Sequence, residues 1–317
     1  MPNYRFNEIK AFVERGLQDF SISRLKEKMP WGVEVPDDSD HVMYVWFDAL
    51  VNYISTLGWP EDTDRFNAFW PGTQVAGKDN LRQQSAMWQA MLMSAGLPRS
   101  KQIYIHGFIT SEGQKMSKSI GNVISPKDLV EKYGIDAVRY YLLGALPAYD
   151  DGDFSTERFE TVYNSELANG IGNLTSRILT MLVKYHNSEV PEVADDMFET
   201  AKFWNKYHVC LDEFKFDEVI KLTNELITAC DTVISEQKPW EKAKNGEDIS
   251  VLLYQLAECL RHIALALLPF IPTTAEKILS SLGIKTDALP PLKEANSWGI
   301  LPPRAIISQS EILFARI

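Results

Sequence analysis

One short segment concentrates the groups that could do chemistry. Residues 113–122 read Gly-Gln-Lys-Met-Ser-Lys-Ser-Ile-Gly-Asn, so two lysines and two serines fall within five consecutive residues. Lysine supplies a mobile point charge, and flanking glycines let a loop bend. Such a loop could close over a triphosphate and stabilise the negative charge that builds on a leaving pyrophosphate. A solvated basic turn is the alternative, and these residues alone leave it open.

The letters Lys-Met-Ser-Lys-Ser resemble the signature loop of the class I aminoacyl-tRNA synthetases, and the flanks His106-Gly107-Phe108 and Gly121-Asn122 match as well. The resemblance implies that an amino-acid carboxylate attacks the α-phosphate of ATP, which enters with Mg²⁺. Lys115 and Lys118 would then be catalytic. The resemblance also implies a set of ATP-binding residues: Arg24, Gly77, Lys78, Asp79, His106, Lys115, Ser117, Lys118 and Ser119.

Two of these expected ATP-binding residues, Asp79 and Arg24, also have simpler structural interpretations. Gly77-Lys78-Asp79-Asn80 follows a predicted strand, at the edge where α/β folds bind nucleotides, and the resemblance assigns Asp79 to the ribose. On local grounds Asp79 is equally well explained as a helix N-cap. Arg24 lies in a stretch, Asp19 to Arg24, that is similar to one in the same family, and a surface arginine is its alternative.

The segment Tyr44 to Tyr53 resembles the methionine-binding segment of the methionyl-tRNA synthetases. The resemblance implies that a methionine pocket is lined by Trp46, Ala49, Tyr53, Gln84 and Trp88. A thioether packs well against aromatic rings, although a Trp and a Tyr here are also ordinary core residues. Gln84 and Trp88 are i and i+4 on one predicted helix face. The family usually has histidine at Gln84 and often proline at Leu50.

A second set of residues suits unpaired RNA. Asn169, Asn173 and Arg177 recur every four residues and so share one face of a predicted helix, and Lys238-Pro239-Trp240 breaks the chain between two helices. Amide and guanidinium groups recognise base edges, and an indole stacks on a base. The resemblance implies that Asn173, Arg177 and Trp240 read the CAU anticodon of tRNA-Met. Solvent-facing asparagines are the alternative.

The elements that must position these residues change character near residue 150. Before it, β-type runs alternate with helical ones; after it, the strand signal vanishes and helical spacing dominates. We therefore predict an α/β fold, the second half of a Rossmann-like parallel-sheet catalytic domain over 1–150, then a helical anticodon-binding bundle over 151–290 and a tail over 291–317. Predicted strands are 42–47, 72–76 and 102–106, and Asp48 is predicted to cap a helix to about Thr56. Further predicted helices are 80–95, 126–132, 136–144, 154–185, 194–214, 216–235 and 250–268.

The amino-acid composition indicates which classes of protein this chain can belong to. The 317 residues are 45% hydrophobic and 24% charged, which is typical of a soluble globular protein, and the net charge of −11 argues against an indiscriminate nucleic-acid binder. The three cysteines stand apart without a CxxC pair, so no zinc site is predicted in this chain, and no apolar run is long enough to predict a membrane span. Neither GxxxxGK[ST] nor GxGxxG occurs. These features favour a cytoplasmic protein.

The five histidines show a departure from the family. None lies in the His-x-Gly-His motif that class I synthetases carry in the first half of the nucleotide fold. A truncated gene, an engineered or processed fragment, and a split enzyme whose N-terminal half is a separate polypeptide all remain open. We predict a methionine–tRNA ligase that is inactive without a half carrying that motif, with ATP, methionine and tRNA-Met as partners and a monomer of the joined enzyme as the default. The alternative is a non-catalytic tRNA-binding module.

Overall fold

The computed structural model describes residues 2–117, 119, 121–309 and 311–317. The chain divides into two compact units, Met1–Phe108 and Ile109–Ile317. The predicted domain boundaries at 150 and 290 stay a prediction.

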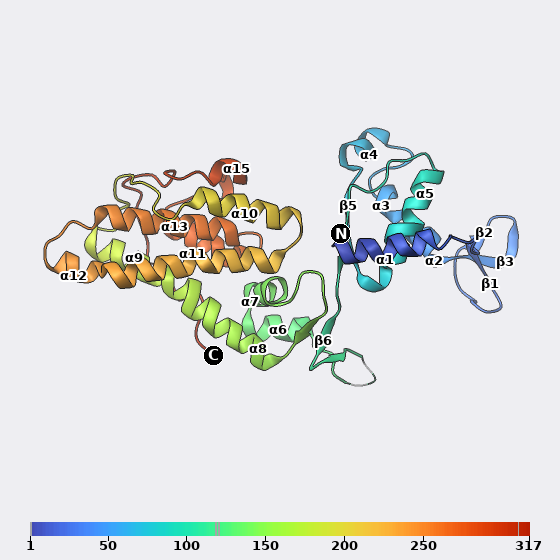
Figure 1. The fold of residues 1–317 in the computed structure, drawn as a ribbon, viewed down its shortest axis with the longest axis horizontal. Coiled ribbons are helices and arrows are strands. Elements are labelled where there is room, and N and C mark those ends of the chain that lie inside the picture. The colour runs from blue at the N-terminus through green and yellow to red at the C-terminus, as the bar shows by residue number, and fades with distance from the viewer. Residues whose placement is uncertain (1, 118, 120, 310) are drawn as a thin grey trace. The chain divides into compact units, whose positions relative to one another are not determined.

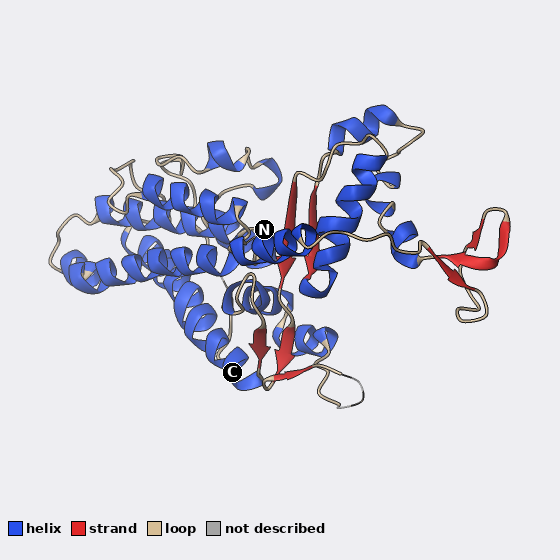
Figure 2. Ribbon diagram, turned by 45° about the vertical axis from the view of Figure 1, so that its right-hand side comes forward, coloured by secondary structure: helices blue, strands red, loops and turns tan. Residues whose placement is uncertain are grey.

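The first unit contains two small sheets. After helix α1 (Asn3–Glu14), strands β1 (Ser23–Leu25), β2 (Glu34–Val35) and β3 (Asp38–Met43) form an antiparallel sheet in the order β1-β3-β2. The second sheet pairs β4 (Thr73–Gly77) with β5 (Gln102–His106) in parallel, in register from Thr73 and Gln102 to Gly77 and His106 (Figure 2). A right-handed crossover through helices is the usual way to join such strands.

Short helices surround these strands. They are α2 (Val45–Ala49), α3 (Asn52–Ser55), α4 (Thr63–Phe69), the 3₁₀ turn η1 (Lys78–Asn80), the π-helical turn η2 (Gln83–Met87) and α5 (Trp88–Ser94). The strands predicted at 72–76 and 102–106 and the helix predicted at 80–95 are confirmed. The side chain of Asp62 caps α4 by accepting a hydrogen bond from the backbone N–H of Arg65, at 3.0 Å.

The strand predicted at 42–47 is wrong in its second half. Strand β3 ends at Met43, and Val45–Ala49 is helical, with Asp48 inside the helix rather than capping it. A short apolar run fits a buried strand and a buried helix equally well, and here tertiary packing decides for the helix. Its strand portion also belongs to the antiparallel sheet and not to the parallel one.

The second unit begins with a three-stranded sheet. Strand β6 (Ile109–Ser111) pairs antiparallel with β7 (Gln114–Lys115) and parallel with β8 (Gly152–Phe154). Between β7 and β8 lie α6 (Pro126–Tyr133), α7 (Ile135–Tyr140) and the π-helical turn η3 (Tyr141–Ala145). The expectation that no strand follows residue 150 is therefore wrong, because β8 is too short to show a periodic pattern.

A helical bundle follows (Figure 1). The expected helices at 154–185, 194–214, 216–235 and 250–268 are confirmed, with shorter bounds for the second and an interruption in the first. The elements are α8 (Thr156–Val162), the π-helical segment η4 (Tyr163–Gly172), α9 (Asn173–Tyr185), α10 (Thr200–Asp212), α11 (Phe216–Gln237), α12 (Pro239–Lys244), α13 (Ser250–Leu267), α14 (Pro272–Ser281), η5 (Thr286–Ala288) and α15 (Leu292–Ala295).

Helix α13 is the centre of the bundle core. It is long and apolar enough to cross a membrane, but 78% of that stretch is buried within the structure, and a soluble core helix has the same composition. Every residue from Leu256 to Leu267 is buried, including three polar ones, Glu258, Arg261 and His262. Buried charges are tolerated only when they are paired and hydrogen-bonded.

Those three polar residues form one network. Arg261 donates to both carboxylate oxygens of Glu258, at 2.9 and 2.7 Å. Glu258 also accepts the backbone N–H groups of residues 299–301 at 2.8 to 3.1 Å, which attaches the C-terminal segment to the core. The indole of Trp204 can only donate, so Nδ1 of His262 accepts its bond at 2.7 Å. Nε2 of His262 lies 2.9 Å from Nη2 of Arg261 and 3.7 Å from Oε1 of Glu258, so the imidazole belongs to the same network.

Candidate active site

A buried chain of polar groups crosses the first unit at the predicted methionine pocket. The Gln74 amide donates to the side-chain oxygen of Gln84 at 2.9 Å, and the Gln84 amide donates to the Tyr53 hydroxyl at 3.0 Å. Gln74 and Gln84 are each only 2% exposed. The Ser100 hydroxyl donates to Gln74 from the other side. These bonds fix the amide of Gln84 and aim the Tyr53 hydroxyl.

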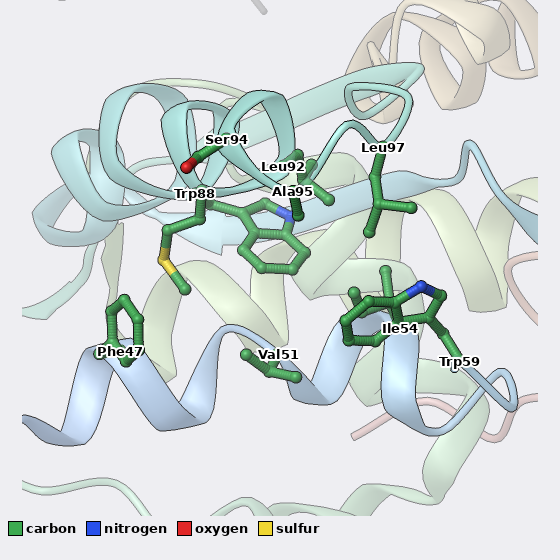
Figure 3. A pocket seen from close by; sticks show the side chains of 10 residues that line it. Phe47, Val51, Ile54, Trp59, Trp88, Leu92, Ser94, Ala95 and Leu97 are labelled. Atoms are coloured by element: carbon green, nitrogen blue, oxygen red, sulfur yellow. The ribbon is translucent and has the colours of Figure 1, made fainter. Parts of the chain in front are cut away.

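Trp88 joins this chain to an apolar cavity. Its ring centroid lies 6.1 Å from that of Tyr53, and its side chain is 1% exposed. The cavity has a volume of about 310 Å³ and lies between the helical stretch 45–59 and α5. Figure 3 shows the Trp88 indole between the side chains of the two stretches. The lining is Phe47, Val51, Ile54, Trp59, Trp88, Met91, Leu92, Ser94, Ala95 and Leu97.

The five predicted methionine-binding residues therefore do not all share one place. Tyr53, Gln84 and Trp88 are in direct contact, and Trp46 is half-buried against the same hydrophobic cluster. Ala49 is exposed. The surroundings of Trp88 are aromatic and thioether groups, which suit an aliphatic or sulfur-containing side chain. One buried polar atom, Nε1 of Trp88, has no hydrogen-bond partner among the described residues.

The carboxyl ends of the two parallel strands bring Gly77, Asp79 and His106 together. A Cβ added at Gly77 would lie 2.9 Å from Oδ1 of Asp79 and 3.7 Å from Cε1 of His106, so a larger residue here would displace the Asp79 carboxylate. Asp79 lies inside the 3₁₀ turn, whose N-cap position is Gly77, so it does not occupy the cap position of this turn. The Lys78 ammonium lies 4.6 Å from the Phe108 ring centroid. A carboxylate and an imidazole at the ends of parallel strands suit recognition of a nucleotide.

Arg24 lines a separate cleft in the same unit. Its guanidinium lies 4.0 Å from the ring centroid of Tyr44 and donates to the carbonyls of Ser21 and Ser23, each at 2.8 Å. The cleft has a volume of about 620 Å³ and includes a second arginine, Arg82. Arg24 is therefore held by its own chain neighbourhood rather than lying loose on the surface.

The lysine loop follows a tight β-hairpin, β6–β7, in the second unit. Between β6 and β7, Glu112 and Gly113 both have positive φ, of 52° and 74°, as a two-residue hairpin turn requires. The Asp153 carboxylate on β8 accepts from the Thr110 hydroxyl and from the backbone N–H of Gly113, both at 2.7 Å. These bonds hold the pKa of Asp153 below its ordinary value and fix the base of the loop.

The loop itself is folded by Asn122. Its side-chain oxygen accepts the backbone N–H of Ser117 at 2.9 Å, and its amide donates to the Lys115 carbonyl at 3.3 Å. The hydroxyls of Ser117 and Ser119 are 2.7 Å apart. Met116 packs against the core of the second unit, while the Lys115 side chain is exposed. Lys118, the other predicted catalytic lysine, lies outside the described residues.

The predicted anticodon residues lie on the bundle. Asn169 and Asn173 are exposed and line one cleft together with Ser176 and the C-terminal segment 311–316. Arg177, one turn further along α9, forms an ion pair with Asp231 of α11. Burial raises the pKa of the Asp231 carboxyl, although the Arg177 guanidinium acts in the opposite direction. Asn169 belongs to η4, so its spacing to Asn173 is not that of an ideal α-helix.

Trp240 is presented by a sharp break between α11 and α12. Lys238 adopts the left-handed conformation with φ of 44°, and Pro239 opens the next helix at its first position, where proline is favoured. The Trp240 side chain is 41% exposed. An exposed indole is available for stacking on an unpaired base.

Several partners of these residues were missed from the sequence. Gln74, Ser100, Asp153 and Asp231 each hold a candidate residue in place. They come from distant parts of the chain and belong to no short motif, unlike Asn122, which flanks the lysine loop. The alternation of β4, with Gln74 and Ala76 buried, was the one signal that a polar residue faced inward.

Comparisons with known proteins agree on the family. The family described as "tRNA synthetases class I (M)" matches residues 1–179, and "Anticodon-binding domain of tRNA ligase" matches residues 197–301. A methionine–tRNA ligase from Thermotoga maritima is 39% identical over 326 residues, covering 100% of this chain and 51% of its own length. One from Thermosynechococcus vestitus is also 39% identical, covering 100% of this chain and 63% of its own length.

Solved structures give the same result. A Mycobacterium tuberculosis methionyl-tRNA synthetase in complex with methionyl-adenylate has a TM-score of 0.90 and 34% identity, and the match covers 100% of this chain and 64% of that one. The apo form of that synthetase has a TM-score of 0.88. The chain spans about half the length of the first curated relatives it matches. The predicted fold class, part of a parallel-sheet catalytic domain followed by a helical bundle, is confirmed, and the chain belongs to the methionyl class I aminoacyl-tRNA synthetases.

Proposed function

We propose that this chain supplies the C-terminal half of a methionine–tRNA ligase, which activates methionine with ATP and transfers it to tRNA-Met. The part of the chain to about residue 150 would hold methionine and ATP, and the helical part to about residue 290 would bind the anticodon. ATP would enter as its magnesium complex. The other half, with the His-x-Gly-His motif, would come from the same or a separate polypeptide, and the joined enzyme would work in the cytoplasm.

In the first step the methionine carboxylate attacks the α-phosphate of ATP. The P–O bond to pyrophosphate breaks, and methionyl-adenylate forms. Lys115 and Lys118 would meet the charge that develops on the leaving pyrophosphate, while Ser117, Ser119 and Arg24 would bind phosphate oxygens. Asp79 would accept hydrogen bonds from the ribose hydroxyls, with Gly77, Lys78 and His106 around the nucleotide. Asn122 and Asp153 support this role because they hold the backbone at Gly113 and Ser117, on either side of Lys115.

Methionine would lie against Tyr53, Gln84 and Trp88, with Trp46 and Ala49 completing the pocket. The bond from Gln84 to Tyr53 supports this proposal, because it leaves the Tyr53 hydroxyl with a fixed direction. Gln84 cannot ionise near neutral pH, unlike the histidine that is usual in the family. In the second step a terminal ribose hydroxyl of tRNA attacks the adenylate carbonyl, and AMP leaves.

The observation that carries the proposal is the presence, in one chain, of an intact lysine loop and of a buried polar network under the methionine pocket. A module that only binds tRNA needs neither. Such a non-catalytic module is the alternative function, and the exposed Trp240 favours it as much as it favours the enzyme. Asn173 and Arg177 would serve both.

Methionine-dependent ATP–pyrophosphate exchange tests the proposal. We expect exchange when the chain is combined with an N-terminal fragment carrying the His-x-Gly-His motif, and little or none from the chain alone. Lys115→Ala should lower the exchange rate of the pair by about 10²–10³-fold, the usual cost of one lost transition-state contact. Lys127→Ala, an exposed lysine on α6, is the matched control and should change nothing.

No exchange in the reconstituted pair, with both parts folded, would exclude the enzymatic function. Binding of a CAU stem-loop that is lost in Trp240→Ala would then leave the tRNA-binding module as the function. Exchange without any preference for the CAU loop would instead leave the activation chemistry and remove the anticodon role.

A further inference from the structure

Arg177 and Asp231 form an ion pair between two long helices of the bundle. The Nη1 group of Arg177 on α9 donates to Oδ1 of Asp231 on α11. Both side chains are half-buried, at 31% and 29% exposure, so solvent screens the pair less than it screens a fully exposed one. The bond uses one of the five N–H donors of the guanidinium and restrains the direction of the side chain, and the other donors remain on the same group.

The position of this carboxylate is unusual for a nucleic-acid surface. An acidic group beside an arginine weakens the attraction of that arginine for phosphates, which supply most of the non-specific affinity for RNA. The chain already carries a net charge of −11. The ion pair therefore lowers the non-specific affinity of Arg177 for RNA phosphates. In return it restrains the direction of the guanidinium.

Helix packing does not need the pair. Both α9 and α11 bury apolar side chains in the same core, including Ile178 on α9 next to Arg177 and Ile234 on α11 near Asp231, each with no exposed surface. The ion pair lies at the edge of that contact. A free arginine side chain loses rotamer entropy when it is immobilised, and less is lost on binding when it is already held.

We propose that Asp231 is a positioning residue for anticodon reading. It holds Arg177 in the orientation that recognises a base edge and lowers the attraction of the same guanidinium for the RNA backbone. Asp231 itself touches no base. This inference rests on the proposed function, in which Arg177 reads the CAU anticodon.

Fluorescence anisotropy with labelled anticodon stem-loops tests the proposal on the whole chain. Two hairpins are needed, one with CAU and one with a single changed anticodon base. The measured quantity is the selectivity ratio, the dissociation constant of the changed hairpin divided by that of the CAU hairpin. Asp231→Asn, which keeps the shape and removes the charge, should lower this ratio by about tenfold. Its affinity for the changed hairpin should stay equal or rise, and its dependence on salt should steepen.

Three further variants complete the test. Arg177→Ala should lower the ratio of the two dissociation constants, as Asp231→Asn does. Asp231→Glu, which restores a carboxylate, should recover part of the ratio. Glu236→Gln, an exposed carboxylate near the end of the same helix, removes the same charge and should leave the ratio unchanged. A merely structural role would lower the unfolding temperature of Asp231→Asn without changing the ratio.

The outcomes separate the inference from the function below it. An unchanged ratio in Asp231→Asn, with the ratio lost in Arg177→Ala, overturns the positioning role and leaves anticodon reading in place. A wild-type chain with no preference for CAU overturns both. An equal loss in Glu236→Gln shows that net charge is responsible, and it also overturns the positioning role.

Discussion

The α/β unit (Met1–Phe108) and the helical unit (Ile109–Ile317) have very different hydrophobic cores. In the helical unit one continuous hydrophobic cluster surrounds α13, and the chain from Leu256 to Leu267 is entirely buried. In the α/β unit most of the described buried hydrophobic residues fall into two small clusters, one around Trp70 and Trp88 and one around Ile105. A large single core stabilises a domain far more than the same area divided into small parts.

The surface of the α/β unit shows the same contrast. The described residues include thirteen exposed large apolar side chains among the 108 positions of this unit, such as Trp31, Phe69 and Val75, and thirteen among the 209 positions of the helical unit. Val75 lies on strand β4 of the two-stranded parallel sheet, and parallel sheets are normally covered on both faces. The helical unit therefore has the core of an independently stable domain. The α/β unit depends more on individual hydrogen bonds, so single substitutions should reveal the difference.

Glu258→Ala should have the largest effect, and it tests the strength of the helical core. It leaves the buried Arg261 guanidinium without its carboxylate and releases residues 299–301. We expect a loss of about 3–5 kcal/mol in the free energy of unfolding of the helical unit. Chemical denaturation followed by circular dichroism measures it, with Glu276→Ala, an exposed position on α14, as the control. Equal effects of the two substitutions would contradict a special role for the buried network.

Acid should weaken the helical unit through the same network. Burial alone would raise the pKa of Glu258, but the bonds from His262 and Arg261 lower it from 4.5 to about 2. Because the folded pKa is depressed, this stabilisation is present above pH 4.5 and is lost as pH falls toward 2, for a total of about 3 kcal/mol. Burial lowers the pKa of His262, so its protonation also destabilises the fold below pH 6.5. Denaturation midpoints from pH 7 to pH 2.5 measure both, and Glu258→Gln should flatten the lower part of the curve.

Gln84→Leu tests the opposite case, an α/β unit that relies on a few polar contacts. It leaves the buried amide of Gln74 and the hydroxyl of Tyr53 without their partner, which should cost about 1–3 kcal/mol. Gln84→His keeps a donor and an acceptor and should cost less. Differential scanning calorimetry should show the loss in the transition of the α/β unit only. A shift of the helical transition would show that the two units unfold together.

The smallest expected effects come from substitutions at helix N-caps. They compare the stability of the two units directly, because the same kind of hydrogen bond is removed in each. Asp62→Ala in the α/β unit and Ser155→Ala in the helical unit each remove one side-chain acceptor from a helix start. Each should cost about 1 kcal/mol. We expect Asp62→Ala to move the midpoint of its unit further than Ser155→Ala moves the midpoint of the larger one, because a smaller unit has a smaller unfolding entropy. Equal shifts in the two midpoints would argue against the difference in core size.

The sequence predicted the parts of this fold that depend on local pattern. The parallel strands at 73–77 and 102–106 and the long helices of the bundle follow from apolar periodicity, and the lysine loop from its letters. The strand predicted over Val45–Phe47 was wrong because a short apolar run does not separate strand from helix. The contacts from Gln74 to Gln84 and from Arg177 to Asp231 could not be predicted, because they join residues on different elements and depend on side-chain direction.

The wide helical turns have a consequence that reaches beyond packing. Gln84 lies in η2 and Asn169 in η4, and a turn of this kind is what one additional residue leaves in an α-helix. The direction of the side chains after such a turn is therefore set by the number of residues as well as by their kind. Deleting one residue between Asn164 and Asn169 would remove no predicted binding group, yet it would rotate Asn173 and Arg177 by about 100° relative to α8. The number of residues within this turn therefore affects the direction of the predicted anticodon residues as much as a substitution would.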